Sequence, residues 1–174
     1  SVGISIIMAQ SGFYAPCSNM TYYPYSKLYT RIIGNDNIFK GESTFQVEMN
    51  EFSTIINECD ENTMVLGDEL CSGTEIGSAI GIFIAGLEHL HNERECSFVF
   101  ATHLHSITSN EHIQNMERLK IQHMSVVYDN ADDKLIYDRK LKDGPGTNSY
   151  GLEVCKSLCM NQKFLENAYK HRNI

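Results

Sequence analysis

The stretch that decides the fold is MVLGDE at residues 64–69, a short apolar run that ends in two acidic residues. Its length favours a buried strand over a helix. A second run of this kind, Phe98-Val99-Phe100-Ala101, ends in Thr102-His103. Between the two, residues 75–91 carry apolar side chains at three- and four-residue steps, which predicts the connecting helix of a βαβ crossover. We therefore expect a core made of a parallel sheet flanked by helices.

The carboxyl ends of these two strands carry the candidate chemistry. In open parallel sheets ligands bind beyond the strand ends, where Asp68, Glu69 and His103 all fall. The first carboxylate can hold Mg²⁺, the second can orient or deprotonate an attacking water, and the imidazole can sense a terminal phosphate. A solvated acidic turn explains the Asp-Glu pair about as well on these residues alone. The pattern thus favours nucleotide hydrolysis without requiring it.

Two further patterns have competing interpretations. His103 and His105 would share one face of a strand and could bind zinc, but no obvious set of further ligands accompanies them. Ser43-Thr44 opens an amphipathic helix, where unpaired backbone N–H groups favour bound phosphate, although on these residues alone an ordinary N-cap is the favoured explanation of the serine. The apolar side chains that define this helix are Phe45, Met49, Phe52 and Ile56.

The remaining elements follow from local composition. They are a buried helix at residues 2–12, a small β region at 14–33, an antiparallel hairpin of residues 120–128 and 134–141, and helices at 149–160 and 162–171.

The overall charge limits the partners of this chain. With 14 Lys and Arg against 22 Asp and Glu, the chain has a net charge of −8, so it should attract nucleic acid only weakly by electrostatics. Its six cysteines show no CxxC pair or zinc spacing, which fits reduced thiols. No window suits a membrane span and the opening lacks a signal peptide's basic region, so we expect a soluble, intracellular protein.

The P-loop motif GxxxxGK[ST] does not occur anywhere in the chain, although its lysine and amides cradle the phosphates in the commonest nucleotide hydrolases. The acidic strand end and the missing loop are reconciled by a family resemblance.

The chain resembles the MutS family of DNA mismatch-repair proteins over nearly all of its length. VGISIIMAQSGFYAPC at residues 2–17 is similar to the helix after the Walker A lysine and the strand that follows. YTRIIGNDNIFKGESTFQVEMNE at 29–51 resembles the segment that leads into the signature helix, and MVLGDELCSGTE at 64–75 resembles the Walker B strand and loop. FATHLHSI at 100–107 is similar to the histidine switch, and GPGTNSYGLEVCKSL at 144–158 to the start of the dimerisation element.

The resemblance implies an α/β fold, the P-loop NTPase of the ABC-ATPase type, with a mostly parallel sheet flanked by helices. Residues 1–143 would form the ATPase core, whose P-loop would lie just before Ser1, and residues 144–174 a helical dimerisation element. The LSGG-type signature of related transporter ATPases is absent, and Ser43-Thr44-Phe45 stands in its place. The 174-residue chain alone is expected neither to bind ATP tightly nor to hydrolyse it.

The resemblance also implies the cofactors, the partners and a role for each site residue. ATP and Mg²⁺ are the implied cofactors, a second MutS-type subunit is the implied partner, and mismatched double-stranded DNA would be held by other domains. The implied roles are Mg²⁺ binding for Asp68, polarisation of the attacking water for Glu69, contact with the γ-phosphate region for His103, capping of the opposite subunit's γ-phosphate for Ser43, packing on adenine for His123, and approach to the nucleotide for Asn35.

One segment departs from the common bacterial pattern. Where that pattern has a Gly-Arg-Gly-Thr loop and then Tyr-Asp-Gly, this chain has residues 70–75 and then Gly77-Ser78-Ala79, so an aspartate at the subunit contact is lost. The DELC-x-GTE loop is more similar to the organellar and giant-virus branch. An alternative function is therefore a catalytically weakened, nucleotide-gated dimerisation scaffold, and a zinc hydrolase built on His103 and His105 is a third.

Overall fold

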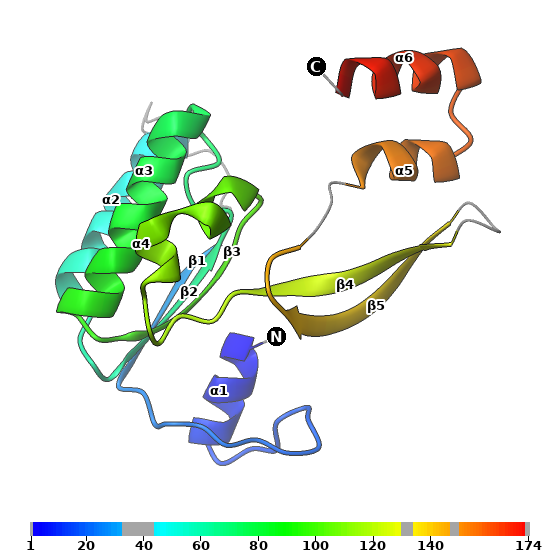
Figure 1. Cartoon of the computed structure of the whole chain (residues 1–174). Helices are drawn as coiled ribbons and strands as arrows, with labels where there is room; N and C mark the ends of the chain where they lie inside the picture. The colour runs from blue at the N-terminus through cyan, green and yellow to red at the C-terminus, as the bar shows by residue number, and fades with distance from the viewer. Residues whose placement is uncertain (1, 33–43, 130–133, 147–149, 173–174) are drawn as a thin grey trace. The chain divides into compact units, whose positions relative to one another are not determined.

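The computed structural model describes residues 2–32, 44–129, 134–146 and 150–172 (Figure 1). The chain divides into two compact units, Ser1–Glu117 and Arg118–Ile174. The sequence-based division at residue 143 separates two functions, the ATPase core and the dimerisation element, and it stays a prediction.

The first unit is built on three parallel strands, β1 (Lys27–Arg31), β2 (Thr63–Asp68) and β3 (Ser97–Ala101), in the order β1-β2-β3. The central strand β2 pairs with both neighbours, and its Val65 is completely buried. α3 (Ile76–Glu88) connects β2 to β3. The predicted parallel sheet and βαβ crossover are thus confirmed.

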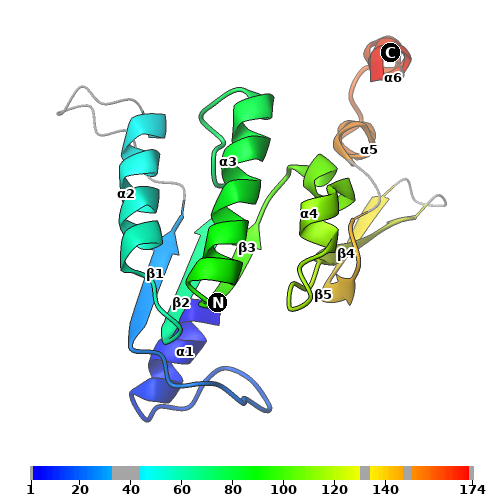
Figure 2. The same cartoon turned by 60° about the vertical axis from the view of Figure 1, so that its left-hand side comes forward.

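Two helices lie side by side on one face of this sheet, α2 (Thr44–Glu58) and α3, as Figures 1 and 2 show. α3 runs on into a π-helical turn, His89–Glu93, so the helix predicted to end near His91 is confirmed to within two residues. The core cluster that they form with the sheet consists of Ile55, Cys59, Val65, Leu90 and Cys96.

α1 (Val2–Gln10) packs on the opposite face. Successive strand residues point to opposite faces, so Leu66 points away from the Val65 cluster, and a Cβ added to Gly3 of α1 would lie 2.7 Å from Leu66 Cδ1. Ile6 is the buried residue of α1, whereas Ile4 is 64% exposed. The prediction of a buried helix is therefore wrong, because one side of α1 meets the sheet and the other faces solvent.

The β region predicted at residues 14–33 is also wrong in extent. Within the described residues up to Ile32, strand geometry is confined to β1, and β1 belongs to the main sheet. The segment before β1 is fastened to α1 instead. The side-chain amide of Gln10 donates to the Tyr25 carbonyl oxygen (2.9 Å), and the Tyr25 backbone N–H donates to Gln10 Oε1 (2.8 Å). These bonds satisfy a backbone that composition alone assigned to strand pairing.

Two short elements after β3 were not predicted, a 3-10 turn at His105–Ser109 and α4 (Glu111–Gln114). Each contributes one buried isoleucine, Ile107 and Ile113. None of the helices in the described segments has both the length and the apolar character needed to cross a lipid bilayer.

The second unit begins with the predicted hairpin, β4 (Gln122–Asp129) paired antiparallel with β5 (Lys134–Asp143). Its two predicted helices are also present, as α5 (Gly151–Ser157) and α6 (Gln162–Arg172). Arg172 Nη1 lies 3.2 Å from Glu153 Oε1, and this ion pair joins α6 to α5.

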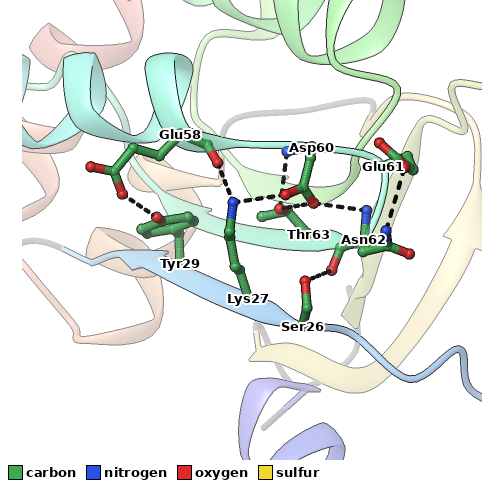
Figure 3. A network of polar contacts seen from close by, with 8 residues as sticks. All are labelled: Ser26, Lys27, Tyr29, Glu58, Asp60, Glu61, Asn62 and Thr63. Carbon is green, nitrogen blue, oxygen red and sulfur yellow. Dashed lines mark hydrogen bonds and ion pairs between the residues drawn. The ribbon is translucent and has the colours of Figure 1, made fainter.

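A polar network fastens the amino ends of β1 and β2 to the end of α2 (Figure 3). Lys27 Nζ lies 2.7 Å from Asp60 Oδ2 and also donates to the Glu58 carbonyl oxygen. Asp60 Oδ1 accepts from the Thr63 hydroxyl (2.9 Å), and Tyr29 donates its phenolic hydrogen to Glu58 Oε2 (2.6 Å). The hydrogen bond from Lys27, followed by that from Thr63, lowers the pKa of Asp60, and the bond to Glu58 raises the pKa of Tyr29 to about 12.

The contact between α2 and α3 predicts opposite effects of two glycine substitutions. A Cβ on Gly86 would lie 2.5 Å from Phe52 Cζ, whereas a Cβ on Gly81 of the same helix would meet nothing within 4 Å. We expect Gly86→Ala to destabilise the fold by roughly 1–3 kcal/mol through overpacking. Gly81→Ala should stabilise it by up to about 1 kcal/mol through helix propensity. Urea unfolding followed by circular dichroism measures both, and equal stability of the two variants would contradict this packing.

The Asp60 network predicts a contribution to stability that acid removes. The pKa of Asp60 is lowered in the folded chain, so the charged carboxylate stabilises the fold above the ordinary Asp pKa of about 4. This contribution is lost as the pH falls through the lowered folded-state pKa. We expect Asp60→Asn to lower the urea midpoint at pH 7, and the difference from the wild type to shrink as the pH falls from 7 to 3. A difference that stays constant between pH 7 and pH 3 would exclude the ionic contribution.

Candidate functional site

The acidic pair and the histidine meet at the carboxyl edge of the parallel sheet, as the sequence predicts. Asp68, the last residue of β2, is paired in register with Ala101, the last residue of β3. The backbone N–H of Glu69 donates to the Ala101 carbonyl oxygen (2.9 Å), which extends the pairing by one step. His103 follows two residues after Ala101, so both strand ends deliver their polar side chains to the same place.

Glu69 and His103 are in direct contact. His103 Nε2 lies 2.6 Å from Glu69 Oε1. Because an ionised carboxylate only accepts hydrogen bonds, Nε2 carries the hydrogen and donates it, which leaves Nδ1 for another partner. The His103 side chain is 83% exposed and that of Glu69 33% exposed, so a ligand arriving from solvent can reach both.

The backbone after β2 turns sharply to present Glu69. Both Glu69 (φ +51°) and Cys71 (φ +68°) adopt the left-handed conformation, which is uncommon for residues other than glycine. The Ser72 N–H donates to the Glu69 carbonyl oxygen (3.2 Å), which closes the turn. Such strained residues persist where the surroundings fix them, and they concentrate at functional sites.

The segment 69–73 after β2, called the acidic loop from here on, is bound by Glu48 of α2. Glu48 was not among the predicted site residues. Glu48 is only 4% exposed, and its Oε1 accepts from the Cys71 backbone N–H (3.0 Å). Arg31 Nη2, at the end of β1, lies 3.7 Å from the same oxygen. The sequence did hold a signal for a buried Glu48. It lies three residues after Phe45 and four residues before Phe52, so it shares the apolar face of the helix.

The buried face of α2 accordingly differs from the apolar stripe predicted for it. Its buried residues are Glu48, Phe52 and Ile55, whereas Met49 and Ile56 are only partly buried. The buried face is therefore rotated by about one residue from the predicted apolar face. Glu48 can be buried because the Cys71 N–H and Arg31 offset the cost of its desolvation.

The zinc interpretation fails in its geometric premise. β3 ends at Ala101 and His105 begins a 3-10 turn, so His103 and His105 do not share the face of a strand. Across the described ranges, no cluster of three or more His, Cys, Asp or Glu side chains is arranged to hold a metal ion.

The structure does not test the remaining predicted nucleotide contacts, Ser43, Asn35 and His123. Ser43 and Asn35 lie outside the described residues. His123 is on β4 in the second unit, where its Nδ1 donates to the Gly144 carbonyl oxygen (2.9 Å) across the hairpin. Its role on adenine, like the nucleotide contacts of Ser43 and Asn35, stays a prediction.

The first unit therefore defines a class of protein, a parallel α/β domain with an acidic pair and a histidine at the ends of neighbouring strands. The sequence model of one family, described as MutS domain V, matches residues 1–174. The chain belongs to the MutS family.

Individual relatives agree with this membership. The chain is 43% identical over 171 residues to a DNA mismatch repair protein mutS homolog of Acanthamoeba polyphaga mimivirus, covering 97% of this chain and 15% of the relative. It is 39% identical over 174 residues to the mitochondrial DNA mismatch repair protein mutS homolog of Sarcophyton glaucum, covering 100% and 17%. It is 38% identical over 157 residues to the DNA mismatch repair protein MutS of Cytophaga hutchinsonii, covering 89% and 18%.

These comparisons also bear on the extent of the chain and its branch. The chain spans less than a fifth of the length of each of these relatives. Of the three, the viral and the mitochondrial proteins share the higher identities, in agreement with the branch expected from the DELC-x-GTE loop.

Cys71, although next to the acidic pair, is not a candidate nucleophile. It is 1% exposed, and burial raises the pKa of its thiol to about 11, while burial raises that of Cys59 to about 12. At pH 8 a thiol with a pKa near 11 has on the order of a hundredfold less thiolate than an ordinary cysteine.

This difference predicts the pattern of thiol alkylation in the folded protein. Iodoacetamide at pH 8 should label the exposed Cys17 and Cys159 quickly and leave Cys71 and Cys59 unlabelled until urea is added. Mass spectrometry of tryptic peptides measures the labelling. Rapid native-state labelling of Cys71 would contradict the burial of this loop.

Proposed function

We propose that this chain is the nucleotide-hydrolysing domain of a MutS-type mismatch-repair protein and that it converts ATP to ADP and phosphate. The proposal is carried by the 2.6 Å contact between Glu69 and His103 beside Asp68, at the edge where parallel sheets bind their ligands. Family membership supports it, since the matched relatives are mismatch-repair proteins by name.

The proposed division of roles follows from charge and position. Glu69 accepts a hydrogen bond from His103 and has a second oxygen with which to orient or deprotonate a water molecule. His103, largely exposed, then contacts the terminal phosphate of ATP. As His103 and Glu69 touch, loss or gain of that phosphate changes the surroundings of the carboxylate directly.

The exposed carboxylate of Asp68 fits a magnesium site. Mg²⁺ binds through one or two carboxylates together with water and phosphate oxygens, so a single aspartate beside a phosphate pocket is a sufficient protein contribution. When bound, the ion neutralises charge on the phosphates. The protein's part is to hold Asp68 at the strand end, one residue before Glu69.

The active site is proposed to be composite. Ser43 of one subunit would cap the γ-phosphate of ATP bound by the other, so that ATP closes two such domains together. This closure would control how domains outside the chain hold mismatched DNA. The P-loop NTPase fold of the ABC-ATPase type belongs to the same proposal, and it is supported by the parallel order β1-β2-β3.

One observation favours the scaffold alternative. Where the common family pattern has an aspartate, the first turn of α3 carries Ser78, and Glu75 caps that helix by accepting from the backbone N–H groups of Gly77 and Ser78 (both 2.7 Å). The carboxylate of Glu75 is thus already used to cap this helix. A domain of this kind could bind nucleotide and gate dimerisation without turnover.

A substitution of the proposed base tests both functions in the whole protein that contains this chain. We expect Glu69→Gln to lower steady-state phosphate release by at least about a hundredfold, with ATP binding retained. Glu61→Gln, at the opposite end of β2, is the matched control and should hydrolyse ATP normally. Normal turnover by Glu69→Gln would refute the assignment, and a wild-type protein that binds ATP without releasing phosphate would establish the scaffold.

A further inference from the structure

The strand β1 lies at the edge of the sheet beside α2 (Figure 2). It pairs with β2 on one side, and among the described residues no strand pairs with its other side. In an edge strand, alternate residues turn their backbone N–H and C=O groups outward, where a further strand can pair with them. Within the described part of the chain, β1 therefore offers a row of backbone groups for pairing.

A groove lies between this edge and α2. Its volume is about 420 Å³, and it is lined by residues 29–32 on the strand side and by Glu51, Thr54 and Ile55 on the helix side. The lining residues of α2 are three and four positions apart at most, so they share one face of the helix. An extended peptide that adds to a sheet edge needs both features, a free strand for its backbone and a pocket beside it for alternate side chains.

The groove carries an excess of negative charge. The buried Arg31 is shared between two carboxylates of α2, those of Glu48 (3.7 Å) and Glu51 (3.3 Å). One guanidinium cannot neutralise both, and the side chain of Glu51 is 55% exposed. The compact unit that contains the groove has four Lys and Arg against 15 Asp and Glu. The charge beside Glu51 therefore favours a cationic side chain in an incoming segment.

The groove also offers apolar surface. Ile32, which follows the last residue of β1, is 60% exposed. The Tyr29 hydroxyl donates to Glu58 Oε2 (2.6 Å), which holds the aromatic ring beside α2. Apolar side chains of a bound segment would cover this surface and gain the free energy of its burial.

We propose that the groove between β1 and α2 binds an extended peptide segment of another protein, which adds to β1 as a further strand and places a lysine or arginine beside Glu51. Backbone hydrogen bonds to β1 supply the affinity, and Glu51 together with the apolar lining selects the sequence. This inference does not depend on the proposed ATPase activity.

Synthetic seven-residue peptides test the charge preference. The probe peptide alternates threonine and valine, has a lysine in place of the central valine and carries a fluorescein label. A second peptide has glutamate in place of that lysine. Fluorescence anisotropy at low salt measures the dissociation constant of each peptide with the whole protein that contains this chain. We expect the lysine peptide to bind about three- to tenfold more tightly than the glutamate peptide.

A charge reversal in the protein should reverse this preference. With Glu51→Lys, the glutamate peptide should bind more tightly than the lysine peptide. Glu61→Lys is the matched control, because it makes the same change of net charge at an exposed residue outside the groove lining. It should leave the preference for the lysine peptide as in the wild type.

Two further comparisons test the strand pairing and the place of binding. Only one set of alternate peptide amides can face β1, so N-methylation of that set should weaken binding at least about tenfold and N-methylation of the other set should be tolerated. Thr54→Trp should fill the groove from the exposed side of α2 and weaken binding of the lysine peptide. Ser53→Trp, at the exposed neighbour outside the groove lining, should leave binding unchanged.

Several results would overturn this inference. They are no saturable binding of the lysine peptide to the wild type, equal effects of the two N-methylations, and equal binding by the Thr54→Trp and Ser53→Trp variants. If Glu51→Lys prevents folding, this last comparison decides, because neither tryptophan replaces a partner of Arg31. A wild type that binds no peptide but self-associates, with a lower sedimentation mass for Thr54→Trp, would assign the groove to a second copy and refute the proposal.

Discussion

The parallel pairing of β2 with β3 is the constraint on which the candidate site depends. Because Asp68 is paired with Ala101, β2 and β3 end side by side at the same edge of the sheet. Glu69 therefore comes within hydrogen-bonding distance of His103. A slip of one residue would turn every β2 side chain to the other face, placing Val65 on the side of α1 and moving the acidic pair by a strand step. Burial of Val65 under α2 therefore fixes the chemistry at the far end of the strand.

Much of this arrangement could be predicted from the sequence, because it depends on short-range patterns. β2, α3 and β3 follow from two apolar runs and one helical repeat, and the topology rule for βαβ units then places Asp68 and His103 at one edge. The hairpin of β4 and β5 follows in the same way from its turn-rich centre. In each case the local preference and the tertiary environment agree.

The predictions that failed needed information from distant residues. The β region before Lys27 was wrong because the backbone of Tyr25 is satisfied by the side chain of Gln10, fifteen positions away. The pairing of His103 with His105 on a strand was wrong because the strand ends two residues before His103. Glu48 was overlooked because a charge at a helical position reads as solvent-exposed until its partners in β1 and the acidic loop are known.

The strain in the acidic loop explains why those partners matter to the chemistry. Left-handed backbone at residues such as Glu69 and Cys71 costs of order 1–3 kcal/mol each and persists only where surrounding contacts offset it. The offsetting contacts come from both sides, the Glu69 N–H bound to Ala101 of β3 and the Cys71 N–H bound to Glu48 of α2. Loss of either bond would remove one of the contacts that offset this strain and that hold Glu69 beside His103. The orientation of the proposed base is thus set by the sheet and by α2 together, which is why a residue remote from the phosphate can govern its position.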